Sequence, residues 1–278
     1  MKMISRRSFL AAAGLSAAAL ALTACVGSSS SVASSVASSA ASSEAVSSAA
    51  AADLTTVEAG KLTMATNATF PPYEMTTDSG EIEGIDVDTA KAIAEKLGLE
   101  LQIDDMEFDA ALLSVQQGKA DIVMAGVTVT DERKAVMDFS DSYATGIQSI
   151  IVPNDSDIAS PDDLAGKKIG TQRGTTGYIY CSDDFGEDSV VAYDSGLTAV
   201  QALNNGQVDA VVIDNAPAKE YVAANPGLVI LDTNYAEEDY AIGMAKGSSL
   251  ESAVNAALEE LKADGTLQTI VDKYITAE

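Results

Sequence analysis

The feature that most constrains the fold is a regular alternation of strand-like and helix-like segments that begins near Leu54. The first half contains, in order, patterns typical of a strand over 61–66, a helix over 86–98, a strand over 99–103, a helix over 108–118 and a short buried strand over 120–126. Strands that alternate with helices form a mostly parallel sheet with helices on both faces. The sequence therefore predicts an α/β fold.

The same alternation starts again in the second half. Ser160 and Pro161 indicate the start of a helix, since Pro suits the first helical position. A strand over 168–172 follows. A helical pattern from Leu197 then leads, through a glycine break, into a strand over 209–213. The order of helix, glycine break and strand also occurs in the first half. We therefore predict two similar α/β lobes.

The chain is expected to cross between the two lobes twice. Helical patterns over 250–263 and 266–274 are expected to pack back on the first lobe. The predicted parts are lobe 1 over 54–143 plus 243–278, lobe 2 over 148–238, and hinge segments over 144–147 and 239–242. Two crossings form a hinge, and the space between the lobes becomes a cleft.

The first residues are typical of an export signal. Lys2, Arg6 and Arg7 precede an apolar run over 9–22, which is short for a transmembrane helix. We predict a signal peptide over 1–24. The arginine pair resembles a twin-arginine signal, and the ordinary secretory route also accepts such segments, so both routes remain open.

Cys25 ends this region in a short motif, LTAC, that resembles a bacterial lipobox. The resemblance implies cleavage before Cys25 and a lipid on its thiol, which would anchor the exported protein to the outer face of the cell membrane. An ordinary signal peptide with a chance cysteine is the alternative. Residues 25–53 are rich in Ser, Ala and Val, a composition typical of a flexible tether. The other cysteine, Cys181, then has no disulfide partner and is expected to fill apolar space.

Charge and composition exclude several classes of function. The chain has 42 Asp and Glu against 16 Lys and Arg, a formal net charge of −26, which argues against nucleic acid because phosphates need a basic face. The chain contains no His and no Trp. Without His, most zinc sites and the most common general base are lost. We expect no metal and no cofactor.

Polar residues follow predicted strands in both lobes, where open α/β sheets bind ligands. Gly126 and Thr128 lead from one strand toward Arg133, Thr176 opens a helix, and Asp214 ends a strand. Helix N-termini and hydroxyls donate hydrogen bonds, and a guanidinium matches a carboxylate. We expect Thr128, Thr176 and Arg133 to hold a carboxylate and Asp214 to accept from an ammonium group. Together they describe an α-amino acid pocket.

An ordinary structural role is available for each of these residues. Arg133 could pair with Asp131 or Asp138 on an exposed helix face. Thr128 could be an N-cap, and Asp214 could cap the helix that follows it. Their joint occurrence at strand ends in two similar lobes favours the binding role.

Five motifs occur in the order, and at about the spacing, of one family: ATNATFPPYE, GIDVDTAKAIAEKLG, FDAALLSVQQGKADIVMAGVTVTDERKAVMDFSDSY, GTTG and VDAVVID. On these motifs the chain, from Thr56 to Tyr274, resembles the bacterial extracellular solute-binding proteins of family 3, the amino-acid receptors of ABC importers. The resemblance implies a two-lobe periplasmic-binding-protein-like fold (type II, Venus flytrap) with two hinge strands. It implies a free amino acid as ligand, and an ABC permease with its ATPase subunits as partners.

The resemblance also implies roles for single residues. Arg133 and Thr128 match positions that hold the ligand carboxylate, and Thr176 matches a position that assists from the second lobe. Asp214 and the carbonyl group of Gly126 match positions that take the ammonium group.

Selectivity for the ligand side chain is expected from Asn67, Phe70, Phe108 and Gln172. The two phenylalanines match aromatic positions that flank the ligand, and ordinary core packing is the alternative for both. Many relatives have an acid where this chain has Asn67. A neutral polar amino acid such as glutamine is therefore expected rather than lysine or arginine.

We predict a monomeric substrate-binding lipoprotein and not an enzyme. One alternative is a dehydratase on the same scaffold that acts on prephenate-like cyclic acids. Such an enzyme needs a general acid in the cleft, for which Glu74 is the nearest candidate by sequence. A ligand-sensing surface lipoprotein is the other alternative.

Overall fold

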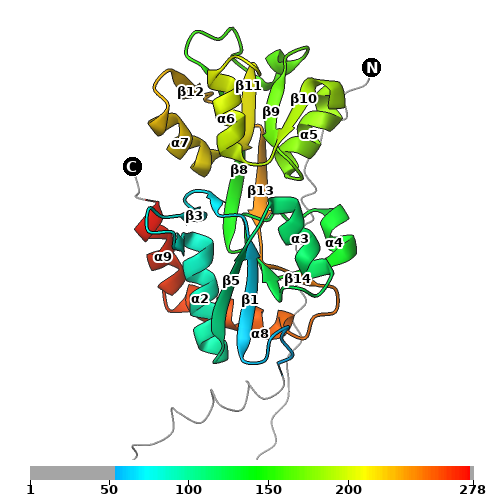
Figure 1. Cartoon of the computed structure of the whole chain (residues 1–278), viewed down its shortest axis with the longest axis vertical. Coiled ribbons are helices and arrows are strands. Elements are labelled where there is room, and N and C mark those ends of the chain that lie inside the picture. The colour runs from blue at the N-terminus through cyan, green and yellow to red at the C-terminus, as the bar shows by residue number, and fades with distance from the viewer. Residues whose placement is uncertain (1–53, 276–278) are drawn as a thin grey trace, which may run out of the picture. The chain divides into compact units, whose positions relative to one another are not determined.

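The computed structural model of the chain describes residues 54–275 (Figure 1). The predicted signal peptide over 1–24, the lipidation site Cys25 and the tether over 25–53 lie outside the described residues. Within 54–275, no helix has the length and apolar character that crossing a membrane requires. The predictions of export and anchoring therefore rest on the sequence.

The first lobe is built on a mixed sheet. Its strands, in spatial order, are β5 (Glu100–Asp105), β1 (Lys61–Thr66), β6 (Ile122–Val123), β14 (Gly243–Ala245) and β7 (Met137–Phe139). β1 is parallel to β5 and β6, whereas β14 is antiparallel to both of its neighbours. A small sheet of β2 (Thr69–Phe70), β3 (Glu74–Thr76) and β4 (Ile82–Glu83) follows β1 in the chain.

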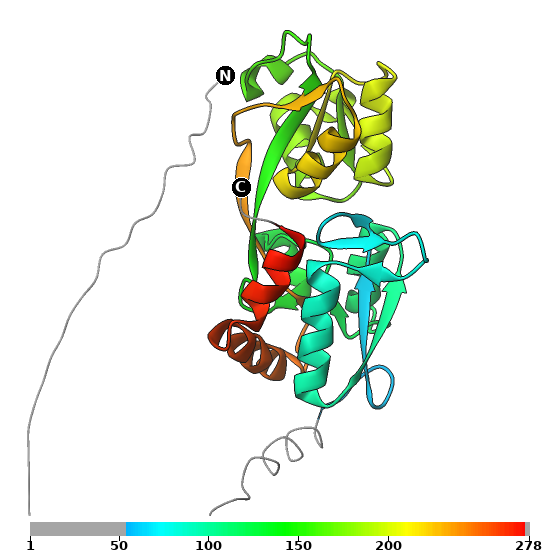
Figure 2. The same cartoon turned by 90° about the vertical axis from the view of Figure 1, so that its left-hand side faces the viewer.

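Helices cover the first sheet. α2 (Ile85–Leu97), α8 (Glu251–Ala263) and α9 (Thr266–Tyr274) contact one another, and Figure 2 shows α8 and α9 beside α2. α3 (Phe108–Gln116) packs against β1, β6 and β14. Along β1, Met64 joins the buried cluster of α2 and Ala65 joins the cluster of α3. This division follows from the strand itself, because successive side chains point to opposite faces.

The second lobe is built on another mixed sheet. Its strand order is β10 (Val190–Tyr193), β9 (Ile169–Gln172), β11 (Ala210–Asp214), β8 (Ala144–Pro153) and β12 (Leu228–Ile230), with β13 (Ala236–Tyr240) also paired to β8. β9 is parallel to β10 and β11, and β8 is antiparallel to β11, β12 and β13. The helices α5 (Thr176–Phe185), α6 (Gly196–Asn204) and α7 (Asn215–Ala224) pack against this sheet.

β8 and β13 connect the two sheets. In the chain, β8 follows β7 and β13 precedes β14, and both β7 and β14 belong to the first sheet. The two strands are antiparallel neighbours, in register from Ala236↔Gln148 to Tyr240↔Ala144. The predicted two-lobe α/β fold with two hinge strands is confirmed. The predicted residue limits of the lobes and of the hinge stay predictions.

Some elements differ from the sequence-based expectation. The buried strand predicted over 120–126 is shorter, because β6 ends at Val123 and Gly126, with a φ of 55°, turns the chain. The strands β2, β3 and β4 were not predicted, since two or three residues are too few for a periodic pattern.

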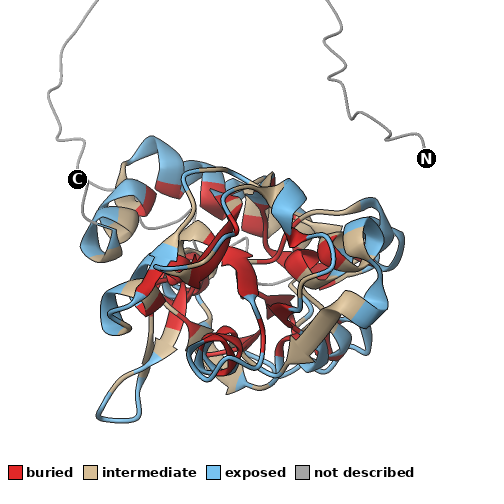
Figure 3. Cartoon of the chain, turned by 90° about the horizontal axis from the view of Figure 1, so that it is seen from above, coloured by how far each residue is buried: buried red, intermediate tan, exposed pale blue. Residues whose placement is uncertain are grey.

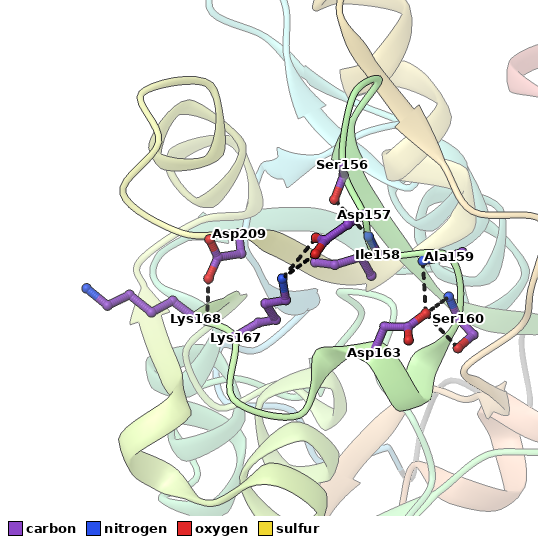
Figure 4. Close-up of polar contacts among 9 residues, drawn as sticks. All are labelled: Ser156, Asp157, Ile158, Ala159, Ser160, Asp163, Lys167, Lys168 and Asp209. Atoms are coloured by element: carbon purple, nitrogen blue, oxygen red, sulfur yellow. Dashed lines mark hydrogen bonds and ion pairs between the residues drawn. The ribbon is translucent and has the colours of Figure 1, made fainter.

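The segment that leads into β9 is held by its own polar contacts (Figure 4). The helix start predicted at Ser160 is the cap of a short 3₁₀-helix, η1 (Pro161–Leu164). Asp163 accepts hydrogen bonds from the N–H and the hydroxyl of Ser160, at 3.0 and 2.9 Å. Lys167 and Asp157 form an ion pair of 2.9 Å beside it. These contacts hold the mostly irregular segment between β8 and β9 in place.

The core of each lobe lies between its sheet and its helices. Viewed from above, the buried residues gather on the strands and on the inner faces of the helices (Figure 3). In the second lobe, Cys181 is a free cysteine in a buried apolar cluster with Ile150 and Ile169. Burial raises the pKa of its thiol to about 12, which fits the expected apolar filler and not a reactive thiol.

Candidate functional site

One cavity brings together every residue that the sequence predicted for the binding site. The predicted residues that line it are Asn67, Phe70, Phe108, Gly126, Thr128, Arg133, Gln172, Thr176 and Asp214. The other residues that line it are Glu74, Ala125, Gln148, Thr175, Ile213 and Tyr240. Both lobes contribute residues, so the cavity is the cleft between them.

The strand ends explain why these residues meet. In the first lobe, Asn67 directly follows β1, and Thr128 lies in the loop after β6. In the second lobe, Gln172 ends β9, Asp214 ends β11 and Thr176 begins α5. The carboxyl ends of parallel strands lie at one edge of a sheet, so the topology collects residues that are far apart in the sequence.

Arg133 is held in the cavity wall by main-chain groups. Its own N–H donates to the hydroxyl of Thr130, the N-cap of α4 (Asp131–Val136), at 3.1 Å. Its Nη1 donates to the carbonyl of Thr128 at 2.7 Å, and its Nη2 donates to the carbonyl of Gly174 in the second lobe at 3.1 Å. The guanidinium also lies over the ring of Phe108, 5.4 Å from its centroid. These contacts fix the orientation of the guanidinium group.

The ordinary role considered for Arg133, a surface ion pair, is not what the structure shows. The side chain is only 8% exposed, and burial lowers its pKa. Asp138 instead pairs with Lys246, at 2.7 Å. Among residues 54–275, no carboxylate forms an ion pair with this guanidinium. A buried cation with neutral partners favours an anion beside it, because only opposite charge offsets its lost hydration.

Thr128 and Thr176 face each other across the cleft, with their hydroxyl oxygens 3.3 Å apart. Both hydroxyls donate to one carboxylate oxygen of Glu238, at 3.1 and 3.0 Å. The side-chain amide of Gln148 donates to the same oxygen at 2.9 Å. Sequence reasoning missed Glu238, since nothing in the acidic run around it distinguishes one acid from its neighbours.

The main-chain N–H of Thr128 is a further candidate donor. Thr128 and Tyr240 form an isolated antiparallel bridge, flanked by hydrogen bonds from Val129 to Asp239 and from Ala241 to Val127. In such a pair, the N–H and C=O groups of the central residues point away from the partner strand. The N–H of Thr128 therefore lies on the same side as its carbonyl, which contacts the Arg133 guanidinium.

Asp214 is both a helix cap and a cavity residue. One of its carboxylate oxygens accepts from the N–H of Ala216 in α7 at 2.9 Å, and the other accepts from the N–H of Ile147 in β8 at 2.8 Å. Asp214 therefore caps the N-terminus of α7, as the ordinary role predicts. Burial raises the pKa of Asp214 to about 6, against these two hydrogen bonds and a third with the Tyr240 side chain, all of which lower it. A nearby ammonium group would relieve this cost of burying the charge.

Asn67 and Gln172, the two polar residues expected to set selectivity, bond to each other across the lobes. The amide of Gln172 donates to the side-chain oxygen of Asn67 at 2.8 Å. The amide of Asn67 donates to the carbonyl of Met106 at 2.8 Å. Phe70 and Phe108 are both buried, and Phe70 also stacks on Tyr73 with centroids 5.8 Å apart. The two rings thus serve core packing and line the cavity at the same time.

Glu74, considered above only as a candidate general acid, also lines the cavity. Its side chain is fully buried, and no N–H or hydroxyl group among the described residues donates to its carboxyl oxygens, which lie within hydrogen-bond reach of the Asp86 carboxyl group. Burial, followed by the charge of nearby Asp86, raises the pKa of Glu74 well above its ordinary value. Two buried carboxyl groups side by side favour a neutral Glu74, so a cation from a ligand would be needed to stabilise its ionised form.

The fold and this cleft define the chain as a two-lobe solute-binding protein. The chain belongs to the bacterial extracellular solute-binding proteins, family 3, whose sequence model matches residues 62–277.

Proteins of known role are similar over most of their length. The L-cystine-binding protein TcyJ of Escherichia coli (strain K12) is 32% identical over 225 residues, which cover 80% of this chain and 85% of TcyJ. The arginine-binding extracellular protein ArtP of Bacillus subtilis (strain 168) is 34% identical over 223 residues, covering 78% and 87%. The crystal structure of a P235GK mutant of ArgBP from T. maritima superposes with a TM-score of 0.75 at 40% identity, covering 78% of this chain and 96% of that chain.

Membership of the family decides between the classes of function considered from the sequence. The chain is a solute-binding protein of the kind that works with ABC transporters, and not an enzyme. The dehydratase alternative is thereby set aside.

Proposed function

We propose that this protein is the substrate-binding lipoprotein of an amino-acid ABC importer. The observation that carries the proposal is Arg133, a cation buried in the cleft and held by carbonyl groups, with no carboxylate partner among the described residues. The α-carboxylate of the ligand binds Arg133 and the N–H of Thr128. The ammonium group binds Asp214 and the carbonyl of Gly126.

The rest of the transport role follows from the fold and from the N-terminal sequence. The ligand docks between the lobes, the lobes close, and the closed form is recognised by an ABC permease with its ATPase subunits. Closure removes water and so strengthens the contacts between ligand and protein charges. A signal peptide over 1–24 and a lipid on Cys25 place the monomer on the outer face of the cell membrane, on the tether over 25–53.

Counting the charges of the cavity indicates the ligand side chain. Among the residues that line it, Arg133 is basic, and Asp214 and Glu74 are acidic. The α-carboxylate and the ammonium group of a ligand match Arg133 and Asp214, which leaves the Glu74 carboxyl group for the side chain. Burial and Asp86 raise the pKa of Glu74, and a cationic side chain beside it would favour its ionised form. We therefore propose an L-amino acid with a cationic side chain, with arginine as the first candidate.

This choice replaces the neutral ligand expected from Asn67 alone. Asn67 already bonds to Gln172 and to a main-chain carbonyl, so Glu74 takes over as the acidic residue of the pocket. ArtP and the T. maritima ArgBP are named for arginine, which supports the proposal, whereas TcyJ is named for cystine. Sequence reasoning did not find this role of Glu74 because the residue stands inside the FPPYE motif, where its burial could not be seen.

The proposed function is tested by thermal-shift screening of the purified protein against the common amino acids and cystine. A ligand at a hundred times its dissociation constant should add about 2.7 kcal/mol to the free energy of unfolding, which is an easily measured shift. We expect arginine to give the largest shift. A panel without any shift would contradict the amino-acid role.

The substitution Glu74→Gln tests the proposed ligand class. It removes the negative charge and keeps the shape, so we expect arginine to bind at least about tenfold more weakly, with glutamine changed by less than about threefold. The matched control is Glu81→Gln, which removes an exposed acid of the same lobe. Calorimetric titration of both variants measures the difference. Equal losses for arginine and glutamine would assign Glu74 a purely structural role.

A further inference from the structure

Glu238 is a buried acid whose place in the fold the binding chemistry above does not explain. It lies on the hinge strand β13, opposite Gly146 of β8, and it is 6% exposed. Its neighbours Glu237 and Asp239 are exposed. Glu238 does not line the cavity, although the residues that bond to it do. The carboxylate therefore lies behind the wall of the cleft and does not occupy it.

The donors to Glu238 come from three parts of the fold. Thr128 belongs to the first lobe, Thr176 is the first residue of α5 in the second lobe, and Gln148 belongs to β8. All three donate to one oxygen, at 3.1, 3.0 and 2.9 Å. The other oxygen is buried and has no partner among the described residues. A single carboxylate on the hinge thus joins both lobes.

These bonds also decide what the two threonines offer to a ligand. A hydroxyl group has one proton and two lone pairs. Because Thr128 and Thr176 direct their protons at Glu238, their oxygens present lone pairs to the cleft and cannot donate to a carboxylate at the same time. The hydroxyl donors expected from the sequence are therefore engaged, and the ligand carboxylate depends on Arg133 and on main-chain N–H groups.

The two hydroxyl oxygens lie within hydrogen-bond distance of each other, at 3.3 Å, and both lie within reach of the same Glu238 oxygen, which can accept from both at once. Glu238 accepts from both only while the lobes are together, because Thr128 and Thr176 move apart when the cleft opens. The bond from Gln148, by contrast, lies within the hinge and the second lobe, so it holds the carboxylate in place in either state.

We propose that Glu238 is a positioning residue that fastens the first lobe to the second from the hinge, and so sets the equilibrium between open and closed forms. The inference rests on the proposed function only for the identity of the ligand. A ligand that requires the closed form binds more weakly in proportion to the fraction of protein that is closed. Loss of Glu238 should therefore weaken every ligand by the same factor.

The first test measures closure without any ligand. Spin labels on introduced cysteines at Leu113 and Leu197, exposed residues of α3 and α6, report the distance between the lobes. Replacing both native cysteines, by Cys25→Ser and Cys181→Ala, keeps the labelling specific. In Glu238→Gln we expect a larger population at the longer distance. The control Glu237→Gln removes the same charge from the same strand, and it should match the unsubstituted protein. Equal distance distributions in all three proteins would overturn the proposal.

The second test measures affinity by calorimetry for two amino acids that bind. In Glu238→Gln both should bind about tenfold more weakly, with their affinity ratio unchanged. A changed ratio would make Glu238 a ligand contact and would overturn the positioning role. Glu238→Ala, which removes the acceptor entirely, should show at least the same loss. If the unsubstituted protein binds no amino acid, the proposed function fails, while the distance measurement still decides the role of Glu238.

Discussion

At the scale of single residues, the site contains buried ionisable side chains that form no ion pair within the part of the protein that the structure describes. Arg133 has carbonyl partners, Asp214 has N–H partners, and Glu74 receives no N–H or hydroxyl hydrogen bond from the described residues. Neutral partners offset only part of the cost of removing a charge from water. A zwitterion supplies the missing charges in one molecule, and this is the physical reason for the specificity we propose.

Arg133→Ala should abolish measurable binding, with a loss of at least about a hundredfold, because it removes the only basic side chain among the residues that line the cavity. We expect little change in the free energy of unfolding, since a buried unpaired cation contributes little to stability. Calorimetry and urea denaturation measure both effects. The control is Arg173→Ala, which removes an arginine that is 53% exposed and paired with Asp194. Retained affinity in Arg133→Ala would refute the assigned site.

Binding should weaken in acid because of Asp214. Burial raises the pKa of this carboxyl group to about 6, and only the ionised form attracts an ammonium group. Between pH 7 and pH 5 the ionised fraction falls, so we expect affinity to fall by about tenfold. Titration calorimetry at both pH values checks this. Asp214→Asn should bind more weakly at pH 7 and show a smaller pH dependence; an equally steep dependence in that variant would point to another acid.

At the scale of elements, the loop from β6 to α4 has a constrained geometry. Its first turn needs a glycine: Gly126 has a φ of 55°, and a Cβ atom there would lie 2.9 Å from the Phe70 ring. Its N–H donates to Asp86 at 3.0 Å, which ties the loop to the start of α2. The loop therefore delivers Thr128 and Arg133 to the cleft from a fixed point.

Gly126 is constrained by its positive φ and by the closeness of the Phe70 ring. Comparing Gly126→Ala with Gly118→Ala separates these two effects. Gly118 has a similar φ of 65°, but a Cβ atom there meets nothing within 4 Å. The control should lose about 1–2 kcal/mol of unfolding free energy from backbone strain alone and keep its affinity. Gly126→Ala should lose more stability, and also its ligand binding, because the Phe70 ring must move. Denaturation and calorimetry compare the two variants, and intact binding in Gly126→Ala would show that the loop tolerates the shift.

At the scale of the whole molecule, several hydrogen bonds cross between the lobes. Besides the bonds to Glu238, the guanidinium of Arg133 reaches Gly174, and Gln172 reaches Asn67. Away from the cavity wall, Tyr221 of α7 donates its hydroxyl to the carbonyl of Thr69 at 2.6 Å. Each bond can form only when the lobes meet, so together they contribute to closure and not to the folding of either lobe.

Tyr221→Phe should weaken ligand affinity by about threefold to tenfold, the worth of one such hydrogen bond, with no change in the preference among amino acids. Tyr235→Phe is a matched control, because its hydroxyl bonds to Asp184 inside the second lobe, at 2.7 Å. Calorimetric titration of both variants provides the measurement. An equal loss of affinity in the two variants would mean that the bond from Tyr221 has no special part in closure.

Sequence patterns predicted the long elements and the cavity residues well, and the short elements poorly. Arg133, Thr128 and Asp214 were found because each follows a strand, and the edge of a parallel sheet is a general place for ligands. The burial of Glu74 and Glu238 was not foreseen, because each lies in a short strand, β3 or β13, where no periodicity indicates burial.

The sequence by itself determined the α/β class, the two lobes and nine of the residues that line one cavity, since these follow from periodicity, strand ends and family motifs. Only the tertiary structure decided which charges in the cavity have partners. Tertiary packing buries Glu74, and the contact between the lobes engages Asn67 with Gln172 and brings three donors to Glu238. Burial and hydrogen-bond partners cannot be found from local sequence patterns, because the residues that meet here are 62 to 110 positions apart in the chain.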